Sequence, residues 1–413
     1  MGFSMKPSAP RARMVSEYSR QFEGFPNACR LVSRLSCASV MGTVAALVAV
    51  GGTSGAHAAL PQGPPPTSFY DVPATVPARP AGTVYRASER QADPGTRFWV
   101  VLYHSRSRTG RDVIVSGVVA VPTRRAPRGG FPIVSFGHGT TGFTDESAPS
   151  RTGDTGTALP FGRLSPLLVS HGYAWAVTDY EGLGTPGPLL FDVGLSAGHS
   201  VLDIARAARH LAGSSISRQV AVLGHSEGGH AALWAGQLAR SYAPDLHVRA
   251  VVASAPGADL LAIGKLRDYA PDTTFGVLGL LGNWHELFGA PLEPLLTPAG
   301  INDAALIVAD HGDQVDLAQP PFRAWPSPLP APWAQLVREN TPGARHTAAP
   351  ILVLVGTADH SVPPATNIAF VKKLRKVGDH VQLKVLQGAD HDHTLLNGKA
   401  TILRFLHDRL GGR

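Results

Sequence analysis

The sequence predicts an α/β fold, in which helices cover both faces of a mostly parallel, doubly wound sheet and a helical cap is inserted late in the chain. Short apolar runs alternate with helical stretches of amphipathic pattern, and one stretch of about 90 residues contains no clear strand. With 413 residues, 44% of them hydrophobic and 16% charged, the chain can bury a full core without disulfides or structural metals. This composition excludes a disordered chain.

The first 58 residues have the pattern of an export signal. The uncharged run 38–50 follows two arginines and precedes Ala56-His57-Ala58, a small-x-small pattern typical of a signal-peptidase site. Because this run is shorter than the roughly 20 residues that span a bilayer, we expect a cleaved signal peptide at 1–58 and a secreted protein. Cleavage would remove both cysteines and lower the formal net charge from +7 to +3. No nucleic-acid partner is therefore expected.

Residues 59–96 are expected to form a Pro-rich N-terminal arm, since 61–80 contain seven prolines in twenty positions. Two alternatives fit this segment: a flexible linker, or an arm wrapped on the domain. A regular pattern begins at residue 97, where RFWVVLYHS and DVIVSGVVAVP predict two antiparallel strands around a turn. One domain is expected over 97–413.

Five continuously apolar runs predict buried parallel strands, because strands covered by helices on both faces lack polar alternation. They are PIVSFGHG (132–139), YAWAVTD (173–179), QVAVLGHS (219–226), VRAVVASAPG (248–257) and PILVLVG (350–356). VQLKVL (381–386) alternates more and suits an edge strand. The strandless insertion at about 258–349 is expected to cap a site, and the alternative is a side-lobe that does not contact substrate.

Gly224-His225-Ser226-Glu227-Gly228 matches the G-x-S-x-G pattern of a nucleophile elbow. The setting makes the match specific, because an apolar strand ends at it and a helical stretch begins from it. Such a sharp turn strains the backbone of the serine, and the flanking glycines keep other side chains away. Ser226 is therefore the candidate nucleophile.

A serine nucleophile requires a base and a group that orients the base. In the strand–elbow–helix class the chain order is Ser, Asp or Glu, then His. Asp359 directly follows the strand PILVLVG and is the candidate orienting acid. The rivals Asp310, Asp313 and Asp316 follow no apolar strand.

The segment Gly388-Ala389-Asp390-His391-Asp392-His393 follows the last expected strand and contains the candidate base. The G-x-x-H spacing favours His391, and His393 is the alternative. A zinc site is a competing interpretation of the crowded His and Asp residues, but no third histidine lies nearby in sequence. No metal and no cofactor are expected.

Two backbone N–H groups are expected to stabilise an oxyanion. The residue after the nucleophile, Glu227, should supply one. The other should follow an earlier strand, in SFGHGTTG, where Thr140 is the candidate and Gly139 and Thr141 are its neighbours.

These pieces together resemble the secretory lipase family of serine α/β-hydrolases, of the fungal lipase A type. The resemblance covers most of residues 97–410 and rests on six segments: SFGHGTTG, DYEGLGTPG, SVLDIARAAR, GHSEGGHAALWAG, GTADHSVP and GADH. It implies an α/β-hydrolase fold with a helical cap, a triad of Ser226, Asp359 and His391, and a secreted lipase or esterase. The implied partner is a small-molecule or lipid ester, with transient contact to a lipid interface through the cap.

Two other functions remain as alternatives: a serine peptidase or amidase on the same fold, and a non-catalytic hydrolase-like binding protein. Apolar side chains of the cap could form an acyl site or could equally pack inside the cap. They are Phe275, Leu278, Leu281, Trp284 and Phe288.

Overall fold

A computed structural model describes residues 61–152 and 164–411 of the chain. The segment expected to be a signal peptide, including both cysteines, lies outside the described residues. In the described ranges no helix is both long and apolar enough to cross a membrane.

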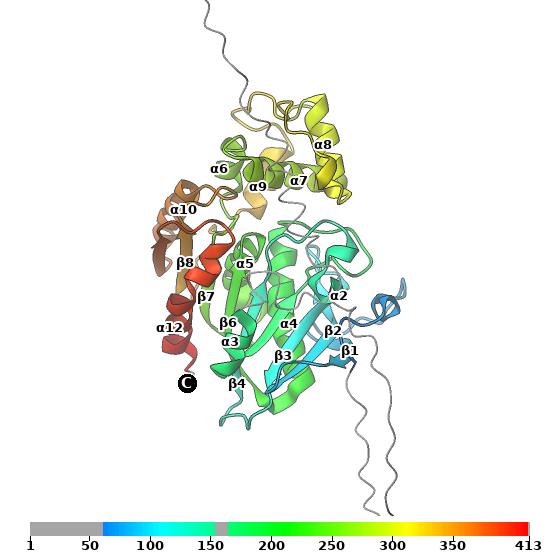
Figure 1. The fold of residues 1–413 in the computed structure, drawn as a ribbon, viewed down its shortest axis with the longest axis vertical. Helices are drawn as coiled ribbons and strands as arrows, with labels where there is room; N and C mark the ends of the chain where they lie inside the picture. Colours follow the sequence, from blue (N-terminus) through cyan, green and yellow to red (C-terminus); the bar gives the residue numbers. More distant parts are fainter. Residues whose placement is uncertain (1–60, 153–163, 412–413) are drawn as a thin grey trace, which may run out of the picture.

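A nine-stranded sheet forms the centre of the molecule, in the order β1-β2-β3-β5-β4-β6-β7-β8-β9 (Figure 1). The first three strands and β5 pair antiparallel, and every pair from β5 to β9 is parallel. The strand bounds are β1 Val84–Arg90, β2 Thr96–Arg106, β3 Asp112–Pro122, β4 Phe131–Gly137, β5 Ala174–Thr178, β6 Ile216–His225, β7 His247–Ser254, β8 Ile351–Gly356 and β9 Val381–Leu386. All the predicted strands are present, and the alternating run 381–386 is the edge strand.

Helices cover both faces of the sheet, as the continuously apolar strands predict. On one face α4, α5 and α10 share a core with the sheet. On the other face the core includes side chains of α3 and α12. The helix bounds are α2 Pro149–Thr152, α3 Leu164–Ser170, α4 Gly194–Ala212, α5 Glu227–Tyr242, α10 Pro364–Lys376, α11 His393–Asn397 and α12 Lys399–Leu410.

The N-terminal arm differs from expectation in one respect, because its end is part of the sheet. Strand β1 lies within the segment 59–96 expected to be the arm, and it pairs with β2 as the other edge of the sheet. The Pro-rich part before it packs on the domain through Phe69 and Tyr70, which are buried in the core beside α3. Arg90 donates hydrogen bonds to carbonyl oxygens at 62–64 and holds the arm in place. Of the two alternatives for 61–80, the structure has the wrapped arm.

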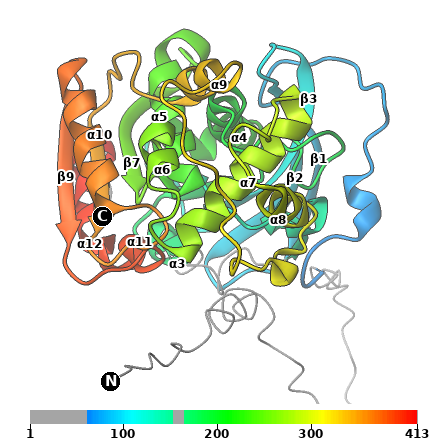
Figure 2. The ribbon, with the colours of Figure 1, turned by 90° about the horizontal axis from the view of Figure 1, so that it is seen from above.

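Between β7 and β8 the chain forms helices and no strand over residues 255–350, a range that the structure describes in full. The helices are α6 Leu260–Lys265, α7 Pro271–Phe288, α8 Pro298–Val308 and α9 Trp333–Asn340. They gather beyond one end of the sheet (Figure 1), and from above they lie between β9 on one side and β1 on the other (Figure 2). We call α6 to α9 with their connections the helical insertion. It has a hydrophobic core of its own.

Candidate active site

Ser226 lies at the turn between β6 and α5, with a φ of 55°. Non-glycine residues seldom adopt a positive φ, and here surrounding backbone hydrogen bonds hold the strained turn. The Ser226 N–H donates to the carbonyl of Ser254 at 3.0 Å, and the Ser226 carbonyl accepts from Gly229 and Gly257 at 2.9 and 3.1 Å.

The two glycines of the elbow are required by close backbone contacts. A Cβ at Gly224 would lie 1.8 Å from the carbonyl oxygen of Gly228, and a Cβ at Gly228 would lie 1.9 Å from the carbonyl oxygen of Gly137. Neither position can hold a side chain without moving backbone. The second contact also brings the elbow against the end of β4.

His391 lies between Ser226 and Asp359, as the chain order Ser, Asp, His predicts. Its Nε2 atom is 2.8 Å from the Oγ of Ser226, and its Nδ1 atom is 2.9 Å from Oδ2 of Asp359. Asp359 is buried and also accepts hydrogen bonds from the backbone N–H groups of Ser361 and Val362. Burial alone would lower the pKa of His391, but the hydrogen bond and charge of Asp359 outweigh burial and raise this pKa above its ordinary value.

The alternative base, His393, also borders the cavity, but its ring contacts Asp390 and not Ser226. Its Nδ1 atom is 2.7 Å from Oδ1 of Asp390, and its side chain is exposed. Within the described part of the chain, no group of three or more His, Cys, Asp or Glu residues is arranged to hold a metal ion.

The expected oxyanion segment lies beside the serine. Gly139 is so close that a Cβ there would lie 3.4 Å from the Cβ of Ser226. Thr140 and Glu227 both line the cavity next to Ser226. The Tyr180 hydroxyl donates to the carbonyl of His138 at 2.8 Å and fixes the start of this segment.

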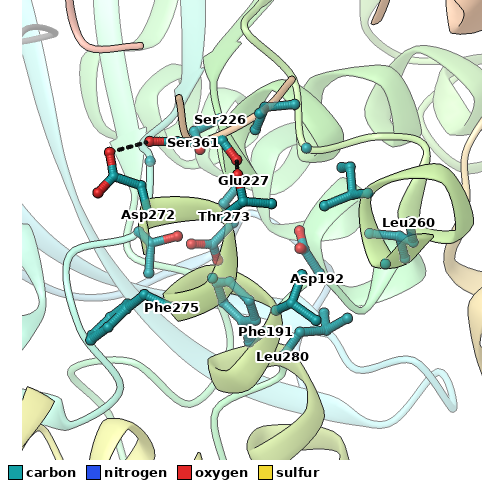
Figure 3. A pocket seen from close by; sticks show the side chains of 18 of the residues that line it. Phe191, Asp192, Ser226, Glu227, Leu260, Asp272, Thr273, Phe275, Leu280 and Ser361 are labelled. Atoms are coloured by element: carbon teal, nitrogen blue, oxygen red, sulfur yellow. Dashed lines mark hydrogen bonds between the residues drawn. The ribbon is translucent and has the colours of Figure 1, made fainter. Parts of the chain in front are cut away.

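A cavity of about 470 Å³ extends from Ser226 and His391 to the helical insertion (Figure 3). Most of its wall is apolar, and α6 and α7 contribute Leu260, Phe275 and Leu280. Of the apolar residues considered for an acyl site, Phe275 and Leu281 line this cavity, whereas Leu278 and Trp284 are buried in the core of the insertion. Phe288 packs against that core.

The helical insertion is tied to the site loops at two places. The Thr273 hydroxyl, at the start of α7, lies 2.9 and 3.0 Å from the carbonyls of His360 and Ser361, next to Asp359. Asp310 accepts hydrogen bonds from Phe143, Thr144 and Ser147, which follow the oxyanion segment. Asp310, a rival for the orienting acid, therefore joins the insertion to a core loop and does not contact His391.

Three further carboxyl groups line the cavity and were not expected from the sequence: Asp192, Asp272 and Asp392. Asp192 precedes α4, Asp272 lies in the first turn of α7, and Asp392 adjoins His391. Figure 3 shows Asp192 and Asp272 on different sides of Glu227. No motif indicated Asp192 or Asp272, because neither follows a strand that ends at the site.

The family comparison agrees with this geometry. Residues 155–283, which contain the elbow, match the family model described as Secretory lipase. Over this stretch the chain is similar to the secretory lipase family. Residues 317–413, which contain Asp359 and His391, also match the model of the Prolyl oligopeptidase family.

Two curated relatives match shorter parts of the chain. Lipase A of Moesziomyces aphidis is 27% identical over 203 residues, which are 46% of this chain and 43% of the relative. Trichothecene C-3 esterase of Fusarium sporotrichioides is 42% identical over 92 residues, 21% of this chain and 20% of the relative. The matches thus span less than half the length of these relatives.

Solved structures of a lipase and of an esterase share the fold. Candida antarctica lipase A in its closed state aligns with a TM-score of 0.67 at 20% identity, covering 82% of this chain and 84% of that one. A ligand-bound form of the rice cell wall degrading esterase LipA from Xanthomonas oryzae aligns with a TM-score of 0.62 at 17% identity, covering 80% and 98%. The α/β-hydrolase fold predicted from the sequence is confirmed.

Proposed function

We propose that this protein is a secreted serine carboxylic-ester hydrolase that acts through an acyl-enzyme, with Ser226 as nucleophile, His391 as base and Asp359 as orienting acid. The observation that carries the proposal is the pair of hydrogen-bond distances that link Ser226, His391 and Asp359 in one line. The names of the lipase and esterase relatives support an ester as substrate.

The reaction follows from the positions of these atoms. His391 Nε2 takes the proton of the Ser226 hydroxyl as Oγ attacks the ester carbonyl, and the tetrahedral intermediate forms. The N–H groups of Thr140 and Glu227 stabilise the oxyanion, a contribution of about 2.7–4 kcal/mol for one donor in comparable sites. His391 then protonates the leaving alcohol. In the second half of the reaction His391 activates a water molecule, which attacks the acyl-enzyme, releases the acid and restores Ser226.

The apolar cavity under the helical insertion supports an acyl chain as its occupant. We take the insertion as the cap of the site. Three of the exposed large apolar side chains lie close together in its first part: Leu261, Leu266 and Tyr269. This placement supports transient contact of the cap with a lipid interface.

The test is a series of p-nitrophenyl esters from C2 to C16, measured beside a panel of aminoacyl anilides. We expect ester turnover that Ser226→Ala lowers by several orders of magnitude. A matched control is Ser361→Ala, which removes a neighbouring cavity hydroxyl outside the triad and should leave far more activity than Ser226→Ala. Full activity of Ser226→Ala would exclude this nucleophile.

A serine peptidase is the second candidate, favoured by the match of residues 317–413 to the Prolyl oligopeptidase family. Amide turnover without ester turnover would replace the esterase proposal with this one. Secretion is tested separately by N-terminal sequencing of protein from the culture medium. A first residue near Ala59 supports cleavage after Ala58, and a start far from it contradicts the proposed site.

A further inference from the structure

Two buried carboxyl groups lie in the cavity wall beside Ser226, and the proposed reaction uses neither. Glu227 directly follows Ser226 as the first residue of α5, and Asp192 lies in the loop before α4. Their exposed fractions are 8% and 7%. Asp192 has a φ of 51°, so the loop holds it in a strained conformation at this place.

Asp192 lies beside His230, a fully buried histidine of α5. His230 Nε2 lies 2.6 Å from the carbonyl oxygen of Asn340, which only accepts, so Nε2 carries a hydrogen. The other ring nitrogen, Nδ1, lies 3.2 Å from Oδ1 of Asp192. Neither of these two buried atoms has a hydrogen-bond partner among the described residues, so the contact is close but is not an aligned hydrogen bond.

Burial favours the neutral form of both groups. Burial lowers the pKa of His230 to about 4, which leaves the ring neutral at pH 7 with a lone pair on Nδ1. Burial raises the pKa of Asp192 to about 8. A neutral carboxylic acid beside a neutral imidazole agrees with both shifts.

Glu227 has no ion-pair partner among the described residues. Burial raises the pKa of Glu227 well above its ordinary value, and ionisation of Asp192 would raise it further, while a hydrogen bond with the Thr140 side chain offsets this only in part. The other titratable group that faces both carboxyls is Tyr180, whose hydroxyl donates to the carbonyl of His138. No basic side chain of the described residues compensates a charge on Glu227.

We propose that Glu227 is a neutral carboxylic acid in the active protein and a positioning residue for the oxyanion donors, with the buried carboxyl of Asp192 in the same cavity wall. The inference rests on the proposed ester hydrolysis. The Glu227 carboxyl contacts Thr140, so it links the two segments that carry the proposed N–H donors. Loss of its proton would put a negative charge beside the site where the oxyanion forms, and this charge would oppose catalysis.

The experiment compares Glu227→Gln with wild type in the pH profile of kcat/KM for a p-nitrophenyl ester. In wild type kcat/KM should fall at alkaline pH, by about tenfold per pH unit for one ionisation. Glutamine stays neutral, so Glu227→Gln should lack this fall. Glu227→Ala should lower kcat more than Glu227→Gln does, because only glutamine can keep the contact with Thr140. An identical alkaline fall in Glu227→Gln, or no fall in wild type up to the pH at which it unfolds, would overturn the proposal.

The matched control is Glu181→Gln. The Glu181 carboxyl is also largely buried, and burial raises its pKa, but it accepts from Ser196 and does not line the cavity. Its pH profile should match that of wild type.

Infrared difference spectroscopy supplies a readout that does not depend on turnover. Wild type at neutral pH should show the carbonyl band of a protonated carboxylic acid that Glu227→Gln lacks, and identical spectra would contradict the proposal. If wild type hydrolyses no ester at all, the proposed function fails, while the infrared band still reports whether Glu227 holds its proton.

Discussion

His391 Nε2 lies 2.8 Å from the Oγ of Ser226, although 165 residues separate the two along the chain. Both residues follow parallel strands, β9 and β6, and the carboxyl ends of parallel strands meet at one edge of a sheet. The intervening residues include the whole helical insertion, which returns to cover the same edge.

The two histidines of the last loop should differ sharply in their effect. His391→Ala removes the group that contacts Ser226 and should lower kcat by several orders of magnitude. His393→Ala removes only an exposed contact to Asp390 and should retain most of the activity. Steady-state kinetics on one ester decides between them, and a greater loss from His393→Ala would reverse the assignment of the base.

The acid side of the pH profile should report His391. Its imidazole must be neutral to accept the Ser226 proton, and the structure raises its pKa above the ordinary 6.5. Activity is therefore expected to fall as pH decreases through a midpoint above 6.5. Asp359→Asn removes the interactions that raise this pKa, so burial should move the midpoint to lower pH, with kcat reduced by about 10⁴. A midpoint that stays in place in Asp359→Asn would contradict the role of Asp359.

The elbow should not tolerate a side chain at Gly228. In Gly228→Ala the new Cβ would meet the carbonyl oxygens of Gly137 and His138 at 1.9 and 2.6 Å. We expect a loss of about 1–3 kcal/mol in the free energy of unfolding, as for other overpacked sites, together with lower kcat because the oxyanion segment must shift. Gly276→Ala is the control for stability, since nothing lies within 4 Å of a Cβ there and alanine favours a helix. Equal Tm values for the two variants would refute the predicted clash of a Cβ at position 228 with the carbonyl oxygens of Gly137 and His138.

Trp284 and Phe275 of α7 should affect different properties. Trp284 is buried, stacks on Trp333 with ring centroids 6.4 Å apart, and donates from Nε1 to the carbonyl of Phe191. Trp284→Ala should cost about 3–5 kcal/mol of unfolding free energy. Phe275 lines the cavity, so Phe275→Ala should change KM and the preferred ester chain length with a smaller change in Tm. The reverse pattern would show that Phe275 is the structural residue of the pair.

Much of the fold could be predicted because strands and helices place apolar residues at different spacings along the chain. The runs 132–139 and 350–356 are apolar throughout, as strands covered on both faces must be, and both are strands in the structure. Strand β1 was missed, because VYRASER at the edge of the sheet is polar and only partly buried. Its pairing with β2 is a long-range effect that local pattern does not indicate.

The sequence by itself determined which residues could be nucleophile, acid and base, since each follows an apolar strand and the chain order restricts the choice. It left His391 and His393 as alternatives, and only the folded loop separates them, by turning His393 toward Asp390. The tertiary structure alone decided the surroundings of Glu227. Asp192 and Glu227 come from different segments, and their burial in one cavity wall exists only after the chain has folded.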